Sequence, residues 1–237
     1  MKAVILAAGR GTRLGSLTSD VPKPMIEVAG VPALEHVIRR IQQAGIDDFV
    51  VVVRYKAESI VDHFGDGSSM NAHIQYAQQP ERYGTGAALL ASQEMVGDSC
   101  LLMTYGDIIA DGENYTEAVR ALDLSESSGV VTINLTQDAG SSVTFDECGT
   151  IHGMVEKPPK GRAYWNSSGI FVFRPEIFGY LQQLCPSARG EYELADAMNA
   201  MIADGHLLKA HYLKGELSDI GTLEGIYAAD TKLAKEH

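Results

Sequence analysis

Apolar and polar positions alternate along the first 110 residues in a way that predicts strands joined by helices. The runs at 3–7 and 49–53 are continuously apolar, as expected for strands that are buried on both faces of a sheet. Residues 33–44 carry an apolar stripe at helical spacing, and Gly45 predicts the end of that helix. Further helices are predicted at 57–64 and 85–95, and further strands at 73–77 and 100–104. This order predicts a mostly parallel sheet that is covered by helices.

The pattern changes after residue 110, where helical segments flank a group of short strands. Residues Asp146–Gly149 have the composition of a hairpin turn between two of these strands. Because no linker rich in Pro, Gly or Ser separates the halves, we expect one domain in which each half holds one ligand. The helices of this half are predicted at 114–127, 175–184, 192–204 and 222–235, and the strands at 129–135, 142–145, 150–156 and 167–173.

The charge of the chain narrows the classes of ligand. The 237 residues include 19 Lys and Arg against 31 Asp and Glu, which gives a net charge of −12. A field of this sign repels phosphate, so a general binder of nucleic acid or of anionic membrane is not expected. Hydrophobic residues make up 45% of the chain, which is a globular composition. Any phosphate site must therefore be local, and built from backbone N–H groups and a few placed cations.

Three cysteines without a C-x-x-C pair indicate reduced thiols, and a cytoplasmic location is expected. No apolar run approaches the roughly 20 residues of a membrane helix, and the apolar start of the chain is too short for a signal peptide. The seven histidines show no zinc-binding spacing, so none is assigned to catalysis.

A glycine-rich segment, Leu6–Leu14, follows the first predicted strand. Glycines at such a place let backbone N–H groups turn toward an anion. The segment is not a P-loop, because no Gly-Lys-Ser/Thr follows, and a dinucleotide fingerprint would need glycine in place of Leu14. Lys23 lies between two prolines, which stiffen the backbone that carries its ammonium. A triphosphate loop is thus plausible, and an ordinary strand-to-loop turn is the alternative.

Leu6-Ala-Ala-Gly-x-Gly-Thr-Arg-Leu14 followed by Pro22-Lys-Pro24 resembles the signature of the sugar-1-phosphate nucleotidyltransferases. The resemblance continues in the same order along nearly the whole chain. It implies an α/β fold, with a Rossmann-like, mostly parallel mixed sheet of the glycosyltransferase-A-like nucleotidyltransferase type. It also implies a single domain over 1–237, with a nucleotide-binding half at about 1–110 and a sugar-phosphate-binding half at about 111–237. The residues that it assigns to the nucleotide here are Leu6, Ala8, Gly9, Gly11 and Thr12, with Arg13 and Lys23 as catalytic cations.

Gln79-Pro-Glu-Arg-Tyr-Gly-Thr-Gly86 resembles the base-recognition segment of that family. The amide of Gln79 offers a donor and an acceptor to the edge of a pyrimidine. Gly84 would allow the backbone to approach the base, and Thr85 is expected to cap the next helix. The spacing resembles that of uridylyltransferases acting on N-acetylglucosamine 1-phosphate, which favours UTP. A plain loop entering a capped helix is the alternative.

Two aspartates are candidates for a metal site. Asp107 follows the predicted strand at 100–104, and ligands of open α/β sheets bind beyond the carboxyl ends of strands. The family's matching aspartate binds metal and nucleotide. The segment Ser218–Thr222 resembles the family's second metal-binding segment, although it lacks the usual Trp and Pro. The resemblance therefore implies Mg²⁺ as cofactor, held by Asp107 and Asp219.

The sugar phosphate is assigned to three residues by the same resemblance. Glu156 matches a glutamate that binds sugar hydroxyls, and Lys157 matches a lysine that contacts the sugar phosphate; an exposed surface pair is the alternative for these two. Asn166 resembles the asparagine of an Asn-x-Gly strand, but one extra Ser precedes Gly169 here and shifts the register. Trp165 is expected in a core or surface role rather than in the sugar pocket.

The implied reaction joins a nucleoside triphosphate and a sugar 1-phosphate, as two small-molecule partners, into a nucleoside-diphosphate sugar and pyrophosphate. Three alternatives remain open: a cytidylyltransferase acting on phosphocholine or a phosphonate, a non-catalytic nucleotide-binding regulatory protein, and a nicotinamide-dependent enzyme, which the missing third glycine disfavours. Family members often form dimers or tetramers, so a homo-oligomer is allowed by the resemblance.

Overall fold

The computed structural model describes residues 1–9, 11, 14, 15 and 21–234. Its helices are α1 (Ala33–Gln42), α2 (Ala57–Phe64), α3 (Thr85–Leu90), α4 (Gln93–Val96), α5 (Gly112–Asp123), α6 (Ile177–Gln182), α7 (Leu194–Ala203) and α8 (Leu223–Leu233). Its strands are β1 (Lys2–Leu6), β2 (Glu27–Val28), β3 (Val31–Pro32), β4 (Asp48–Val53), β5 (His73–Gln78), β6 (Leu101–Tyr105), β7 (Ile108–Ala110), β8 (Gly129–Thr136), β9 (Ser141–Phe145), β10 (Ile151–Glu156), β11 (Tyr164–Phe173), β12 (Leu208–Tyr212) and β13 (Leu217–Asp219). Two 3₁₀ turns, Lys23–Met25 and Ser68–Met70, complete the described elements.

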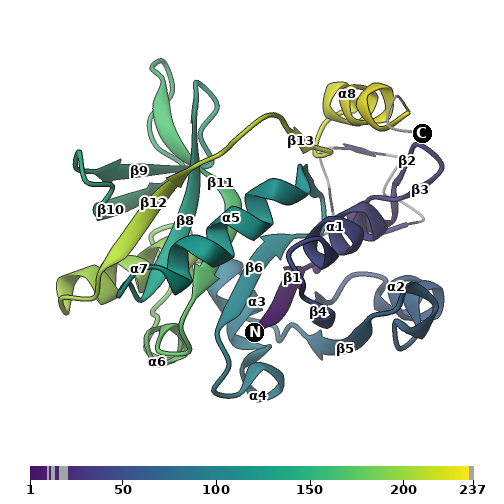
Figure 1. The fold of residues 1–237 in the computed structure, drawn as a ribbon, viewed down its shortest axis with the longest axis horizontal. Coiled ribbons are helices and arrows are strands. Elements are labelled where there is room, and N and C mark those ends of the chain that lie inside the picture. The colour runs from purple at the N-terminus through teal and green to yellow at the C-terminus, as the bar shows by residue number, and fades with distance from the viewer. Residues whose placement is uncertain (10, 12–13, 16–20, 235–237) are drawn as a thin grey trace.

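A nine-stranded mixed sheet forms the centre of the molecule (Figure 1). Strands β5, β4, β1 and β6 lie side by side in that order and are all parallel, as the alternation of strands and helices predicts. The sheet then becomes antiparallel, because β11 pairs with β6 and also contacts β8 and β9. The predicted fold class, a mostly parallel mixed sheet flanked by helices, is confirmed.

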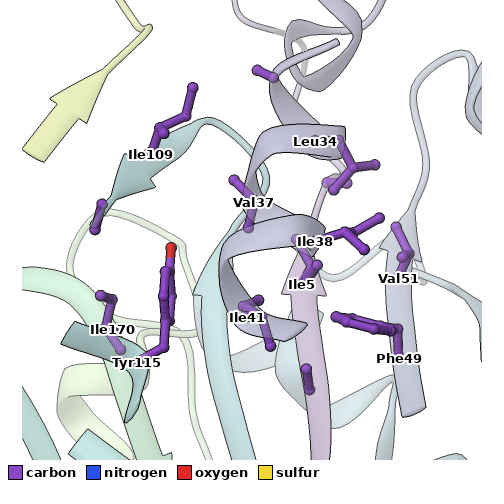
Figure 2. Packing of buried hydrophobic residues seen from close by; sticks show 14 of the residues in the cluster. Ile5, Leu34, Val37, Ile38, Ile41, Phe49, Val51, Ile109, Tyr115 and Ile170 are labelled. Atoms are coloured by element: carbon purple, nitrogen blue, oxygen red, sulfur yellow. The ribbon is translucent and has the colours of Figure 1, made fainter. Parts of the chain in front are cut away.

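Helices cover both faces of this sheet, and each face has its own apolar core. One core contains the inward residues of α1, α2, α5 and α8, and the other contains those of α3, α4, α6 and α7. The stripe on α1 shows how the pattern produces this packing: Leu34, Val37 and Ile41 are fully buried. Figure 2 shows Ile38 of the same helix beside Ile5 of β1, with Phe49 of β4 close by and Val37 on the side of Ile109. The apolar run of β1 is continuous because its residues serve both cores alternately.

Two predicted helices differ from those observed. The helix expected at 85–95 is divided into α3 and α4, because the buried Ser92 hydroxyl donates to the Leu89 carbonyl at 2.7 Å and competes with helical bonding there. The helix expected at 114–127 begins earlier, at Gly112, and ends at Asp123. The strand expected at 167–173 also begins earlier, at Tyr164.

The predicted turn at Asp146–Gly149 joins β9 to the antiparallel β10. The Asp146 carboxylate accepts hydrogen bonds from the backbone N–H groups of Cys148 and Thr150, both at 2.9 Å, and Gly149 adopts a positive φ of 74°. The turn therefore has the side-chain chemistry that the sequence predicts.

Short strands were not predicted at all. β2, β3, β7 and β13 have two or three residues each, too few to show a period, and β12 was missed as well. In the part of the chain that the structure describes, no helix is long and apolar enough to cross a membrane. Cys100, Cys148 and Cys185 are free thiols.

Candidate active site

The candidate site lies where the connections of the sheet diverge. β1 leads through α1 to β4 on one side, while β6 pairs with β1 on the other side, so the carboxyl ends Leu6 and Tyr105 are adjacent. Open α/β sheets bind ligands at such a point, because the two connections leave a crevice between them. A cavity opens here, and it is lined by Leu6, Ala7, Ala8, Gly9, Lys23, Pro24, Gln79, Tyr83, Gly84, Thr85, Ala88, Tyr105, Asp107 and Glu191.

The glycine-rich segment forms one wall of this cavity. Leu6, Ala8 and Gly9 line it directly, as predicted for residues that touch the nucleotide. Gly11 has a positive φ of 65°, and the buried Leu14 anchors the far end of the segment. The predictions for Thr12 and Arg13 fall outside the described residues.

Lys23 reaches the cavity from the 3₁₀ turn Lys23–Met25, which begins after Pro22. Its ammonium forms an ion pair with the Asp107 carboxylate and lies 3.4 Å from the Asp219 carboxylate. The side chain of Lys23 is 11% exposed and that of Asp107 is 20% exposed, so this pair is shielded from water. Three predicted site residues from distant parts of the sequence are thus in contact.

A small sheet brings the two aspartates together. β7 follows Asp107 directly and pairs antiparallel with β13, which ends at Asp219. The backbone N–H of Ile220 donates to the Asp107 carbonyl at 3.1 Å, which closes the pairing. The Asp219 carboxylate accepts the N–H of Gly221 at 2.7 Å, so its orientation is also fixed.

The donor set suits Mg²⁺. Two carboxylates converge on one cation, here the ammonium of Lys23, and Mg²⁺ is commonly held by one or two carboxylates together with substrate phosphates. Within the described residues no group of three or more His, Cys, Asp or Glu side chains could hold a metal ion. A divalent ion at Asp107 and Asp219 would therefore take its other ligands from water and substrate.

Gln79 follows β5, which β1 and β4 separate from β6 and Asp107, so it lines the opposite end of the cavity; it is 6% exposed. Its Nε2 donates to the carbonyls of Arg82 at 3.3 Å and Gly84 at 3.5 Å. Its Oε1 has no hydrogen-bond partner among the described residues, so the amide keeps its acceptor for a ligand. The backbone thus orients the one side chain that the sequence assigns to the base.

The segment 83–86 is locked to Tyr192 from the second half of the chain. Tyr192 donates its N–H to the Tyr83 carbonyl and accepts the N–H of Gly86, both at 2.8 Å. Gly84 has a φ of 128°, and a Cβ there would lie within 3 Å of the Tyr192 backbone. Glycine is therefore required by this close approach as well as by its φ.

Thr85 does not cap α3, contrary to expectation. Gly84 is the N-cap residue, and Thr85 is already the first residue of the helix. The Thr85 hydroxyl instead accepts the N–H of Leu194, at 3.0 Å, at the start of α7. The hydroxyl therefore joins two helices across the sequence, while the residue still lines the cavity.

Glu156 belongs to a cluster of charges around Arg189 beside the cavity. The Arg189 guanidinium contacts Glu191 at 2.7 Å, Glu193 at 2.9 Å and Glu156 at 3.9 Å. Burial, followed by the nearby charge of Glu193, raises the pKa of Glu156 to about 7. Arg189 was not singled out from the sequence, because its contact with Glu156 forms only when β10 and the 187–193 loop meet.

Burial also raises the pKa of Glu193, and it raises the pKa of the Tyr105 phenol well above its usual range. Three carboxylates therefore share one guanidinium at the edge of the cavity. Glu191 lines the cavity itself, so this cluster is continuous with the site around Lys23.

Asn166 lies in β11, and Lys157 directly follows the end of β10. The Asn166 Oδ1 accepts the N–H groups of Gly140 at 2.9 Å and Ser141 at 3.1 Å, and its Nδ2 donates to the Ser167 carbonyl at 2.7 Å. The amide thus holds the connection between β8 and β9. Lys157 has an exposed side chain and a positive φ of 47°, and its N–H donates to the Gly140 carbonyl.

Trp165 takes part in an aromatic cluster on the sheet. Its ring meets those of Phe145 and Tyr212 edge-to-face, with centroid distances of 5.7 and 5.3 Å. Trp165 is 36% exposed and is not among the residues that line the cavity.

Comparison with known proteins agrees with this geometry. A family model described as nucleotidyl transferase matches residues 2–236. The UTP–glucose-1-phosphate uridylyltransferase AglF of Haloferax volcanii is 35% identical over 248 residues, which cover 100% of this chain and 98% of the relative. The bifunctional protein GlmU of Methanococcus maripaludis is 36% identical over 230 residues, which cover 93% of this chain and 51% of the relative. The chain thus spans about half the length of the GlmU relative.

Solved structures share the fold. A structure from Bacillus anthracis, described as a glucose-1-phosphate thymidylyltransferase in complex with a sucrose, matches with a TM-score of 0.89 at 25% identity, covering 100% of this chain and 96% of that one. A UDP-glucose pyrophosphorylase complexed with UDP-glucose matches with a TM-score of 0.86 at 21% identity, covering 100% of this chain and 99% of that one. At that identity the second likeness concerns the fold alone.

Proposed function

Because the chain belongs to the nucleotidyl transferase family, within its sugar-1-phosphate nucleotidyltransferases, we propose that it joins UTP to a sugar 1-phosphate and releases pyrophosphate. The observation that carries this proposal is one cavity with two chemically different ends. Gln79 at one end suits a nucleobase, and Lys23 with Asp107 and Asp219 at the other suits phosphate and a divalent ion. The first half of the chain would hold the nucleotide, and the second half would hold the sugar phosphate.

The orientation of Gln79 supports uracil over cytosine. Its Nε2 is engaged by backbone carbonyls, which leaves Oε1 as the atom available to a base. Uracil presents an N–H at ring position 3 that can donate to this oxygen, whereas cytosine has a lone pair at that position and would have to donate from its exocyclic amino group. Uracil is therefore the base that we favour. Thymine presents the same N–H, so contacts to the ribose 2′-hydroxyl and to the thymine methyl group must determine whether UTP or dTTP is bound.

The chain's own residues would align and neutralise anions. The sugar phosphate already carries the attacking oxygen as an anion, so the reaction needs no strong general base, and alignment and charge stabilisation supply the rate. Lys23 would bind the triphosphate and stabilise the pyrophosphate that leaves. When bound to Asp107 and Asp219, Mg²⁺ would offset the repulsion between the two reacting anions. Arg13 remains a predicted second cation.

The acceptor would lie beside the charge cluster at Arg189. Glu156 would accept hydrogen bonds from sugar hydroxyls, and Lys157 would contact the sugar phosphate. The half-buried position of Glu156 next to the cavity supports this role, because a carboxyl shielded from water gains more from a ligand hydroxyl than an exposed one does. The free thiols are in keeping with the cytoplasmic location that we propose.

A pyrophosphate-release panel tests this function. Four nucleoside triphosphates are each combined with a set of sugar 1-phosphates and with phosphocholine, with and without Mg²⁺. We expect release from UTP with at least one sugar 1-phosphate and only with Mg²⁺. Release from CTP and phosphocholine would instead establish the cytidylyltransferase reading, and no release from any pair would favour a binding protein.

A further inference from the structure

Tyr83 is an exposed aromatic residue in the wall of the cavity. Tyr83 is 58% exposed, while Gln79 and Ala88, which line the same end of the cavity, are buried. Ligand pockets are lined largely by apolar and aromatic side chains, so an aromatic ring that is exposed in the wall of a cavity can contact a ligand. The Tyr83 hydroxyl makes no hydrogen bond to any described residue.

The backbone that carries this ring is held in place before any ligand binds. The Tyr83 carbonyl accepts the N–H of Tyr192, and the next residue, Gly84, packs directly on the Tyr192 backbone. On the other side, the Arg82 guanidinium lies 5.3 Å from the centroid of the Tyr192 ring. Tyr83 is thus an exposed side chain on an ordered segment, and binding to it costs little ordering entropy.

Two kinds of contact meet at this end of the cavity. Gln79 offers a hydrogen-bond acceptor to the edge of a base, and Tyr83 offers a π-face. A planar, edge-polar group is the ligand that uses both at once. We propose that the Tyr83 ring is the surface on which the nucleobase stacks while Gln79 reads its edge. This inference rests on the proposed function and adds the residue that supplies affinity for the base.

The stacking role makes a graded prediction. Tyr83→Phe keeps the ring and should bind UTP within about threefold of the wild type. Tyr83→Ala removes the ring and should weaken UTP binding by about 5- to 150-fold, the range found for loss of one base–aromatic stack. Tyr83→Leu should lie between the two. Tripolyphosphate has no base, so its inhibition constant should be the same in all variants.

The experiment measures UTP binding by calorimetry and tripolyphosphate inhibition of turnover for the wild type and each Tyr83 variant. Tyr227→Ala is the matched control, because Tyr227 is 73% exposed and lies outside the cavity. Weakened UTP binding with unchanged tripolyphosphate inhibition, ordered Phe, Leu, Ala, supports the proposal.

Three outcomes would overturn it. Unchanged UTP binding by Tyr83→Ala would remove the stacking role and leave the proposed function intact. Equal loss of tripolyphosphate and UTP binding would mean that Tyr83 serves the structure of the loop. A wild-type protein that binds no UTP would contradict the proposed function itself, and the stacking role with it.

Discussion

The carboxyl group of Glu156 makes folding stability depend on pH in a direction opposite to that of an ordinary salt-bridged acid. Burial and the charge of Glu193 raise its pKa to about 7 from an ordinary value of 4.5. The native state therefore holds this proton more tightly than the unfolded chain. Between pH 4.5 and about 7 the free energy of unfolding should fall as pH rises, because the native state binds more protons than the unfolded state in that window.

Glu156→Gln removes this titration while it keeps the shape of the side chain. Each pKa unit corresponds to about 1.4 kcal/mol, so the rise from 4.5 to about 7 corresponds to about 3 kcal/mol at most. The attraction of Arg189, 3.9 Å away, is already contained in this pKa, and the 28% exposure of the Glu156 side chain screens part of the remaining cost. We expect the variant to gain about 1 to 3 kcal/mol relative to the wild type between pH 5 and pH 8. The gain should level off above pH 8.

Urea unfolding at pH 5, 6, 7 and 8 measures this difference. Glu147→Gln is the control, because Glu147 is exposed in the turn between β9 and β10. A stability difference between Glu156→Gln and the wild type that stays constant across this range would refute the reasoning. It would mean that Glu156 is ionised throughout and that Arg189 compensates its burial fully.

Three further substitutions test the site. Gly84→Ala forces a Cβ onto the Tyr192 backbone and should cost about 2 to 5 kcal/mol in chemical unfolding; a normal midpoint would show that the loop can shift. Lys23→Met should lower turnover at least about 100-fold. It should also reduce the half-saturating Mg²⁺ concentration, because an ammonium no longer competes with Mg²⁺ for Asp107 and Asp219. An unchanged half-saturating Mg²⁺ concentration would show that Lys23 does not contact the proposed metal site. Asn166→Ala leaves the N–H of the buried Ser141 without its acceptor and should cost about 1 kcal/mol of stability, read by thermal unfolding. Full stability with weakened binding of the sugar phosphate would make Asn166 a ligand residue instead.

The sequence predicts well those elements whose burial produces a recognisable pattern of apolar residues. β1, β4 and β6 are buried on both faces and read as continuous apolar runs, and α1 buries one stripe. β7 and β13 show no such pattern, because each has three residues and is defined by its pairing with the other. The proposed metal site depends on that pairing, so its geometry could not be predicted although both aspartates could be named.

The sequence likewise predicts some residues of the candidate site and not others. Lys23 and Gln79 are named by the resemblance to a family motif, and both line the cavity. Arg189 was missed, because Glu191 and Glu193 beside it in the sequence read as an ordinary charged segment, and Glu156 reaches it only in the folded chain. The prediction that Thr85 caps α3 is wrong. A Thr before a helix usually predicts a cap, and its actual partner, Leu194, is too distant in the sequence to be predicted from the local pattern.

The backbone of Tyr192 joins the two halves of the chain at the candidate site. The segment that would read the base belongs to the first half, yet its shape is held by a backbone from the second half. The same loop carries Arg189 and Glu191, which lie next to the predicted acceptor residue Glu156. A movement of this loop that admits an acceptor must therefore displace the support of Tyr83 and Gly84. In the proposed function, affinity for the base and affinity for the acceptor would then be linked through the Tyr192 peptide rather than through a hinge between domains.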